Sequence, residues 1–465
     1  MRRVAAIVLC ATVIALGLNV SSGSAQEGPA GSFEIVGHSP LENRGMNAAP
    51  AIYRDYAYIG SRTDAKAENT NGAGVLIVDI SDPTAPDVVG AIGPPDEANP
   101  GETSRELRIW QDQELLIVMT LFSNCGEIHG CSPVNGQDRF NFYDISGENA
   151  GAPKLLATYE PSINPHEFFL WDDPKKPGRA LLYIAPAGSS QLLVTDISGA
   201  RQGKFTELLT SPIGYQSGGL HSLGISNDGK RGYLAHLTGG VGVIDTSAFT
   251  NPKAKPAIRI VTPPGNAPRW EGPGPHSAVK VFGKPYMLIT DEVYGTAMRA
   301  LGGHGCPWGW VHMIDIKDPI KPKLVSEYKL PQNDESFCPQ DAAHPTTSFA
   351  AHNPTLTKNL AFITWHSGGL QAVDISNPLE PTQVAEFVAT PVIPILQEDP
   401  VLSSGGDKVV AWSYPIIKDG LIYFVDVRNG LYVMRYKGPF DKEVTPISFI
   451  EGNSNQGDAL RFEKP

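Results

Sequence analysis

Gly74-Val-Leu-Ile-Val-Asp79-Ile-Ser-Asp-Pro83 is a short apolar run that ends in an aspartate turn, and copies of it recur along the chain. Six further copies stand at residues 142–146, 193–198, 240–247, 311–319, 369–378 and, in degenerate form, 430–434. Their spacing of roughly 50 to 70 residues is at or above the range of propeller blades. The sequence is therefore organised as seven repeats.

Each repeat predicts four short antiparallel strands joined by tight turns. In the fourth repeat, residues 221–226 form a first strand, 227–230 a turn and 231–236 a second strand. The Asp-Gly, Gly-Gly and Asp-Pro pairs between these runs are residues that tight antiparallel turns require. Seven such units predict an all-β fold, a seven-bladed β-propeller, because radial repetition leaves few exposed strand edges.

The propeller is expected over residues 26–440, between a signal peptide at 1–25 and a C-terminal tail at 441–465. The last repeat supplies only three strands, so the N-terminal strand 32–38 is expected to pair with 430–436 and complete the last blade. The segment 444–450 is a competing candidate for that edge.

The Asp-Ile-Ser-Asp/Asn-Pro units resemble the LVIVD-repeat proteins, a family of secreted and surface β-propellers, and the likeness covers most of residues 30–440. A histidine-lined seven-bladed ring also resembles, more distantly, two oxidase families. These are the methanethiol oxidase and selenium-binding proteins, which use copper, and the carotenoid oxygenases, which hold iron with four histidines. The second resemblance is one of architecture only.

The N-terminus has the pattern of a secretory signal. Arg2 and Arg3 precede an apolar stretch from Val4 to Leu18, and small residues before Gln26 favour cleavage there. No later apolar run approaches the roughly 18 residues of a membrane span. A net charge of −12 argues against nucleic acid or an anionic membrane as partner. We expect a secreted or periplasmic protein that has no membrane span.

Four cysteines remain after signal removal, and an even number in an oxidising compartment predicts two disulfides. We expect Cys125–Cys131 and Cys306–Cys338, with a cysteine-based metal site as the competing interpretation. Both pairs lie in long insertions, at 120–139, 292–309 and 331–351, which the strand count places on one face of the ring together with 390–409.

Four consecutive repeats open their first strand with a histidine, at His166, His221, His276 and His352. First strands line the central channel of a propeller, so these imidazoles are expected to converge near its axis. The corresponding places in the other repeats hold Asn47, Arg105-Glu106 and Trp412-Ser413. A single histidine at such a position is more often structural, but four in one register predict metal ligands.

A second row of polar residues ends the second strands, one layer out from the channel. His236, His366, Asp291 and Glu167 are expected to form a second shell that holds the far nitrogens of the ligand imidazoles. Glu292 is the strongest carboxylate candidate, and Glu292 and Glu106 are predicted to be catalytic. The remaining histidines have no repeat register and are expected in loops or on the surface: His38, His129, His304, His312 and His344.

Neutral imidazoles suit copper, iron or zinc rather than calcium or magnesium. Copper ranks first, iron second and zinc third, since copper leads the affinity order and an exported chain collects its metal outside. The predicted function is a metal-dependent oxidoreductase that acts on a small-molecule substrate, with dioxygen as a candidate oxidant.

A binding propeller without catalysis is the alternative, in which the histidines only form hydrogen bonds. The loop aromatics Trp308, Trp310 and Trp412 would then contact an extracellular ligand or protein partner. The oligomeric state and the substrate are left open by the sequence.

Overall fold

The computed structural model describes residues 29–62, 74–93, 103–121, 137–186, 188–215, 219–251, 253–270, 274–292, 305–338, 348–399, 402–403 and 405–463. Within them the chain is built almost wholly of antiparallel strands. The exceptions are one-turn helices: α1 (Ser247–Thr250), α2 (Asp441–Val444), α3 (Ala459–Phe462) and 3-10 turns at Leu41–Asn43, Gln111–Gln113, Gly147–Ala150, Ala200–Gln202, Pro264–Asn266 and Pro331–Asn333. No helix in these ranges is long and apolar enough to cross a membrane.

Four sheets each consist of four strands that pair in sequence order. The first contains β10 (Pro165–Asp172), β11 (Ala180–Pro186), β12 (Gln191–Gly199) and β13 (Lys204–Pro212), and the second contains β14 (Leu220–Ile225), β15 (Arg231–His236), β16 (Gly240–Asp245) and β17 (Arg259–Ile260). The third contains β18 (Pro275–Lys280), β19 (Tyr286–Asp291), β20 (Val311–Asp315) and β21 (Lys323–Tyr328). The fourth contains β22 (Pro354–Leu356), β23 (Leu360–Thr364), β24 (Leu370–Asp374) and β25 (Thr382–Phe387). Each sheet is one of the predicted repeats.

An eight-stranded sheet contains the first two repeats. Its halves are β2 (Asn47–Tyr53), β3 (Tyr56–Ser61), β4 (Val75–Asp79) and β5 (Asp87–Ile92), and β6 (Thr103–Trp110), β7 (Leu115–Leu121), β8 (Arg139–Asp144) and β9 (Lys154–Tyr159). The two halves are joined through a single residue pair, Ser61 opposite Ser104.

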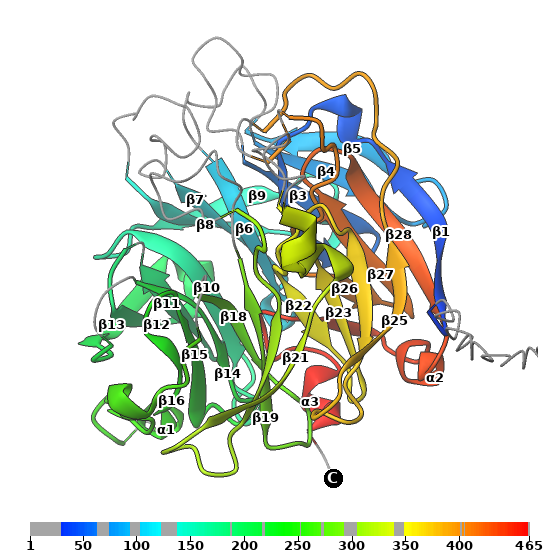
Figure 1. Cartoon of the computed structure of the whole chain (residues 1–465). Helices are drawn as coiled ribbons and strands as arrows, with labels where there is room; N and C mark the ends of the chain where they lie inside the picture. Colours follow the sequence, from blue (N-terminus) through cyan, green and yellow to red (C-terminus); the bar gives the residue numbers. More distant parts are fainter. Residues whose placement is uncertain are drawn as a thin grey trace, which may run out of the picture.

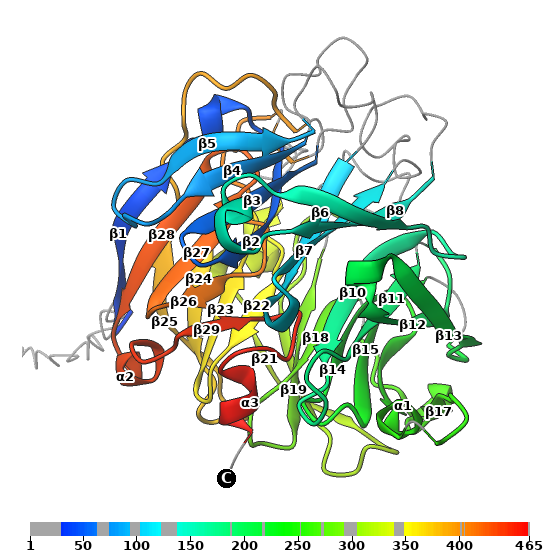
Figure 2. The ribbon, with the colours of Figure 1, turned by 180° about the vertical axis from the view of Figure 1, so that it is seen from behind.

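The sheets follow one another around a central axis, as the ribbon shows from two sides (Figures 1 and 2). The first strands of successive sheets contact each other in the order β2, β6, β10, β14, β18 and β22, and β2 also contacts β26 (Ile416–Lys418) of the last sheet. The expectation of an all-β propeller is confirmed.

The ring closes through the two ends of the chain. The last sheet has the order β1 (Ser32–Ser39), β28 (Gly430–Lys437), β27 (Leu421–Asp426), β26 and β29 (Phe449–Glu451). Strand β1 pairs with β28 from Ser32 opposite Lys437 to Ser39 opposite Leu431, as predicted. The N-terminal strand therefore supplies the missing outer strand of the last repeat.

The C-terminal segment does not compete for that outer edge. Strand β29 pairs instead with β26, the innermost strand of the last sheet. The chain then runs past the far ends of other first strands. Asn453 O accepts from Leu170 N, and Asn455 Oδ1 accepts from Asp172 N at 2.7 Å. Residues 449–455 of the expected tail thus pack against the ring, and α3, which follows them, lies at the bottom of Figure 1.

The aspartate of each Asp-Ile-Ser run forms the turn that ends its strand. In five copies the carboxylate accepts a hydrogen bond from the backbone N–H two residues on, at 2.7–2.8 Å. These residues are Asp79, Asp196, Asp245, Asp315 and Asp374. The repeat is therefore conserved in shape along the chain because the same local hydrogen bond terminates each third strand.

Apolar side chains pack between neighbouring sheets and not on the axis. One cluster joins Phe140 and Phe142 of β8 to Phe168 of β10, and another joins Trp171 of β10 to Leu223 of β14. The core is thus divided among the interfaces between sheets, which leaves the axis free for polar residues.

One of the two predicted disulfides lies in the described residues. Cys306 and Cys338 are bonded, with Cα atoms 5.2 Å apart, as expected. The pair Cys125–Cys131 and the signal peptide lie outside the described residues.

Pairing of β1 with β28 predicts that the N-terminal strand stabilises the whole ring. Phe33 packs its ring 5.7 Å from Tyr436 and 6.2 Å from Phe362, whereas Ile35 on the same strand is 52% exposed. We expect Phe33→Ala to lower the free energy of unfolding by about 2 kcal/mol and Ile35→Ala by less than about 0.5 kcal/mol. Denaturant unfolding measures both.

Deletion of residues 26–40 removes the whole strand and should lower the melting temperature by about 5 °C or more. A melting curve unchanged by the deletion would show that β1 does not hold the ring closed.

Candidate functional site

Three of the four repeat histidines stand at irregularities of the first strands. The pairing register shifts between Pro165 and Glu167, between Leu220 and Ser222, and between Pro275 and Ser277. The residues passed over are His166, His221 and His276. A β-bulge leaves one residue out of the ladder and re-aims its side chain, and bulges are common beside functional sites. His352 stands just before β22, with its backbone N–H bonded to Thr364 O at 2.9 Å.

These four imidazoles lie side by side in chain order. The Nε2 atoms of His166 and His221 are 2.9 Å apart. Ring centroids are 4.1 Å apart for His221 and His276, and 4.2 Å for His276 and His352. The structure therefore brings all four predicted ligand residues into one cluster, which we call the histidine cluster.

Glu292 and His366 complete this cluster. Oε1 of Glu292 lies 3.2 Å from Nε2 of both His352 and His366, and its Oε2 lies 3.5 Å from Nε2 of His276. His366 was expected one layer further out, but its ring centroid is only 4.9 Å from that of His352. Glu292 therefore contacts the Nε2 side of the rings, not the far nitrogens that a second shell would hold.

The far nitrogens have other partners. Nδ1 of His352 donates to the carbonyl oxygen of Trp412 at 2.5 Å. Nδ1 of His276 is 2.8 Å from the hydroxyl of Ser277, which itself donates to Asn353 Oδ1 at 3.2 Å, so the imidazole is the donor. Both rings are thereby fixed in the tautomer that leaves a lone pair on Nε2, the form that binds a metal.

Burial keeps three of the clustered rings, His221, His276 and His366, neutral near pH 7. It lowers the pKa of His221 and of His366 to about 4, and it holds the pKa of His276 well below its usual value. Burial alone would raise the pKa of the Glu292 carboxyl, but the neighbouring His352 and His276 hold it well below its ordinary range. The cluster therefore places three neutral imidazoles, His221, His276 and His366, close to one carboxylate anion.

A deeper layer of charged groups lies under the histidines. Oε1 of Glu167 is 3.9 Å from Nε2 of His276, and burial together with Glu106 raises the pKa of Glu167 to about 8. Glu106 accepts a hydrogen bond from Arg108 at 3.0 Å, and Arg108 also lies 3.5 Å from Glu451 of β29. Glu106 is thus held by an arginine instead of reaching the histidine cluster.

Two sets of ligand atoms are close enough to hold an ion among the described residues. Glu167, His221 and His276 form one, and His276, Glu292 and His352 form the other; within each set the atoms lie within 4.8 Å of one another. His276 belongs to both sets, at the centre of the arc.

Two predicted second-shell residues make their contacts elsewhere. His236 bonds through Nε2 to the Ser190 hydroxyl at 2.7 Å and through Nδ1 to the backbone of Gly239. Asp291 accepts from Trp270 Nε1 and contacts His312 Nε2, both at 2.7 Å. These residues end second strands as expected, but their side chains serve the packing between sheets because the register points them away from the rings.

His312 was expected in a loop or on the surface, and this prediction is wrong. It lies in β20, fully buried, with its ring 4.0 Å from Trp270 and its Nδ1 3.0 Å from Glu327. Its place inside the Val311–Asp315 repeat run was the signal that could have indicated burial. His129, His304 and His344 lie outside the described residues.

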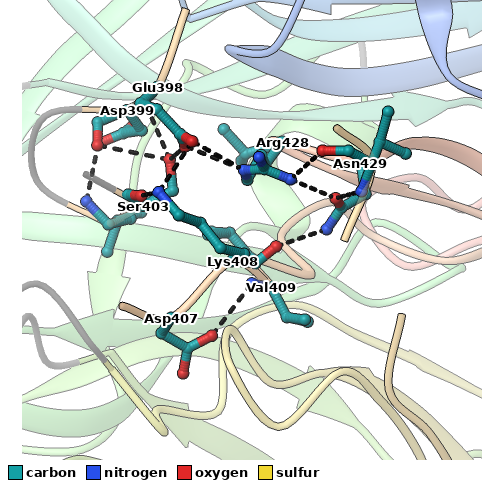
Figure 3. A network of polar contacts seen from close by, with 12 residues as sticks. Glu398, Asp399, Ser403, Asp407, Lys408, Val409, Arg428 and Asn429 are labelled. Carbon is teal, nitrogen blue, oxygen red and sulfur yellow. Dashed lines mark hydrogen bonds and ion pairs between the residues drawn. The ribbon is translucent and has the colours of Figure 1, made fainter. Parts of the chain in front are cut away.

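The segment around Glu398, within the insertion between the last two repeats, is held by a network of charges (Figure 3). Glu398 accepts from Lys408 at 2.8 Å and from Arg428 at 3.0 Å. The next residue, Asp399, pairs with buried Arg62 at 3.1 Å, and the Arg62 guanidinium lies over the Trp412 ring at 5.1 Å. Since the Trp412 carbonyl fixes His352, this insertion supports one wall of the histidine cluster.

Comparisons with known proteins bear on the fold. The LVIVD repeat model matches residues 49–92 and 355–388, and no curated protein matches the sequence.

Solved structures similar to this chain include Sqt1 of Chaetomium thermophilum bound to the N-terminus of ribosomal protein L10 (14% identity, 86% of this chain and 89% of that one, TM-score 0.45). Two others are the β-propeller domain of Myceliophteria thermophila Cps50 (9%, 84% and 96%, 0.48) and the periplasmic gluconolactonase of Pseudomonas aeruginosa (15%, 85% and 98%, 0.47). These likenesses are too distant to bear on function.

The ion pair of His312 predicts a pH dependence of stability. Burial lowers the pKa of His312, but Asp291 and Glu327 outweigh it and raise the pKa above its ordinary value. A raised histidine pKa adds stability below about pH 6.5, and that stability is lost as the pH rises through the folded-state pKa. We expect the unfolding midpoint of the wild type to fall as the pH rises above about 6.5.

His312→Gln should lose this dependence and cost about 3–5 kcal/mol at pH 6, because it leaves Asp291 buried without its partner. Denaturant midpoints at several pH values measure both effects. A wild-type midpoint that stays constant over this range would contradict the prediction.

Proposed function

We propose that this LVIVD-repeat β-propeller protein holds one transition-metal ion at His166, His221, His276 and His352 and uses it to oxidise a small molecule. The observation that carries the proposal is the placement of four imidazoles side by side on an arc of neighbouring first strands. Hydrogen bonds donated by Nδ1 of His276 and His352 leave the lone pairs of these two rings on Nε2, the side that faces Glu292.

The spacing of one pair of rings, His166 and His221, suits ligation of a common ion. Two imidazole nitrogens bound at about 2.0–2.1 Å, with an angle of about 90–109° between them, lie about 2.9–3.4 Å apart. The Nε2 atoms of His166 and His221 are 2.9 Å apart. Imidazole donors suit copper first, iron second and zinc third, and a redox-active ion would supply electron transfer to the site.

The two carboxyl groups beside the rings suit different roles because their pKa values are pushed apart. Glu292 has a pKa held well below its ordinary value, so it remains an anion that offsets the charge of a bound cation. Glu167, with a pKa of about 8, carries a proton near neutral pH. Groups separated in this way suit distinct electrostatic and proton-donating roles. We therefore favour Glu167 over Glu106 as the proton-bearing residue of the site.

The same proposal includes seven blades and export. The eight-stranded sheet counts as two blades because only one residue pair joins its halves. The charged and apolar pattern of residues 1–25 supports transport out of the cytoplasm. An exported protein folds and collects its metal outside the cytoplasm.

A binding propeller remains the second candidate, and one observation favours it. A cavity of about 1250 Å³ on the outer part of the ring is lined by Trp310, Tyr328 and Lys329, with prolines on either side. Lys329 lies 3.7 Å over the Trp310 ring. This surface is separate from the histidine cluster, so the two functions can be tested apart.

Metal content tests the proposal directly. Purified protein that has been exported should carry about one equivalent of copper, iron or zinc by elemental analysis. Alanine at His166, His221, His276 or His352 should reduce this to about a tenth or less, because each removes one of the few ligands of the ion. The matched control is His38→Ala, whose imidazole bonds to Asn429 O and stacks on Tyr432 away from the cluster.

Wild-type protein that binds no more metal than its four alanine variants would refute the metal site. Equal loss in His38→Ala would attribute the effect to destabilisation instead of ligation.

Glu292 should affect how tightly the metal binds but not how many ions bind. We expect Glu292→Gln to bind one equivalent of metal with an affinity lower by about 10- to 100-fold, because the amide no longer offsets the charge of the cation. Glu327→Gln is the control, since Glu327 pairs with His312 outside the cluster. Competition with a chelator measures both affinities, and equal affinities in the two variants would contradict this role.

A further inference from the structure

Arg105 occupies the place of a fifth member of the histidine arc. In β6 the register shifts between Ser104 and Glu106, so Arg105 is passed over in the same way as His166, His221 and His276 in the next three repeats. The first strand β6 contacts β10, which carries His166. Arg105 as a whole is only 8% exposed. The repeat therefore places a buried cation at the end of the row of imidazoles.

Three arginines are buried around this end of the ring, and two of them face carboxylates. Arg62 pairs with Asp399 at 3.1 Å, and Arg108 pairs with Glu106 at 3.0 Å. Arg105 makes no ion pair within 4.0 Å among the described residues, although it attracts the Glu167 carboxyl at longer range, and its buried Nε has no hydrogen-bond partner there. A buried charge of this kind is costly unless a partner is supplied.

A second unpaired donor lies beside it. The Arg105 guanidinium is 5.8 Å from the centre of the Trp412 ring, and the buried indole Nε1 of Trp412 also has no hydrogen-bond partner in the described part of the chain. The same indole ring lies 4.9 Å from His352. Two N–H donors without acceptors, one of them charged, thus lie next to the histidine cluster.

We infer that Arg105 and Trp412 bind the carboxylate group of an anionic substrate beside the histidine cluster. A carboxylate accepts hydrogen bonds on both oxygens, and the planar guanidinium is the side chain that matches it in shape and charge. Glu292 and Glu106 repel such a substrate from their own positions, which directs it to the Arg105 end of the arc. As a statement about substrate class, the inference rests on the proposed function, but binding of the anion itself requires no metal.

Butyrate and its neutral isostere butyramide are suitable probes, titrated by calorimetry into metal-free and metal-loaded protein. Wild type should bind butyrate at least about tenfold more tightly than butyramide in both forms. Arg105→Met should abolish that preference. Arg105→Lys should keep part of it, since the charge remains but the fork of donors is lost. Trp412→Phe should weaken butyrate binding and leave butyramide binding unchanged.

Arg54→Met is the control. Arg54 is an exposed arginine in the turn after β2, where it pairs with Glu114. Its loss should leave the affinities for butyrate and for butyramide unchanged. Thermal unfolding gives a second readout. Arg105→Met should melt no lower than wild type because it removes an unpaired buried charge, whereas Arg108→Met should melt lower because it leaves Glu106 unpaired.

The inference is overturned if wild type binds butyrate no better than butyramide, or if Arg105→Met keeps the preference. A protein that takes up no metal but loses butyrate binding in Arg105→Met would refute the proposed oxidoreductase and leave the anion site standing. A protein that binds one equivalent of metal, and whose butyrate affinity is unchanged in Arg105→Met, would refute the anion site and leave the metal site standing. If Arg105→Met does not fold, the comparison of Arg105→Lys with wild type decides the question.

Discussion

The pairing of β1 with β28 is the interaction on which the remaining structure depends. A ring of sheets has no free edge only if its two ends are joined, and here the N-terminal strand supplies the outer strand that the last repeat lacks. Closure fixes the positions of all first strands around the axis. The histidines are brought together by that closure and not by any contact between neighbouring residues in the sequence, since His166 and His352 come from sheets that are three repeats apart.

The division of the apolar core explains how the axis can be polar. Aromatic and aliphatic side chains pack between sheets, as Phe168 packs edge-on against Phe140 at 5.1 Å, so each interface carries its own share of the stability. The axis then tolerates groups that would be costly in a single core. Buried imidazoles, Glu292 and Arg105 are retained there at a cost to stability, which is the expected arrangement at a site kept for binding or chemistry.

The two ends of the axis differ. Histidines stand where the first strands β10, β14 and β18 begin, while the C-terminal segment contacts the opposite ends of β6 and β10, where Gln456 Nε2 donates to Ile109 O at 2.7 Å and Asn455 Oδ1 accepts from Asp172 N. Glu451 joins this layer to Arg108. The tail thus covers one end of the axis, and the long insertion that carries Glu398 and Asp399 supports the other. The tail and the insertion add to the repeat architecture without altering it.

Sequence by itself determined the repeat and the common register of the four histidines, because both follow from a local pattern that recurs at a fixed place. It also indicated the strand that closes the ring, from the strand missing in the last repeat, and one disulfide, from the even number of cysteines. It placed His236 and Asp291 correctly at strand ends but misjudged their partners. It also missed that His312 is buried and that His366 lies beside His352 in the histidine cluster. Only the tertiary structure decided which ring nitrogens face Glu292, that Ser277 and the Trp412 carbonyl hold the others, and that Arg105 makes no close ion pair within the described part of the chain. Those facts depend on bulges and on contacts between sheets, and a one-residue shift in register turns a side chain to the other face of its strand.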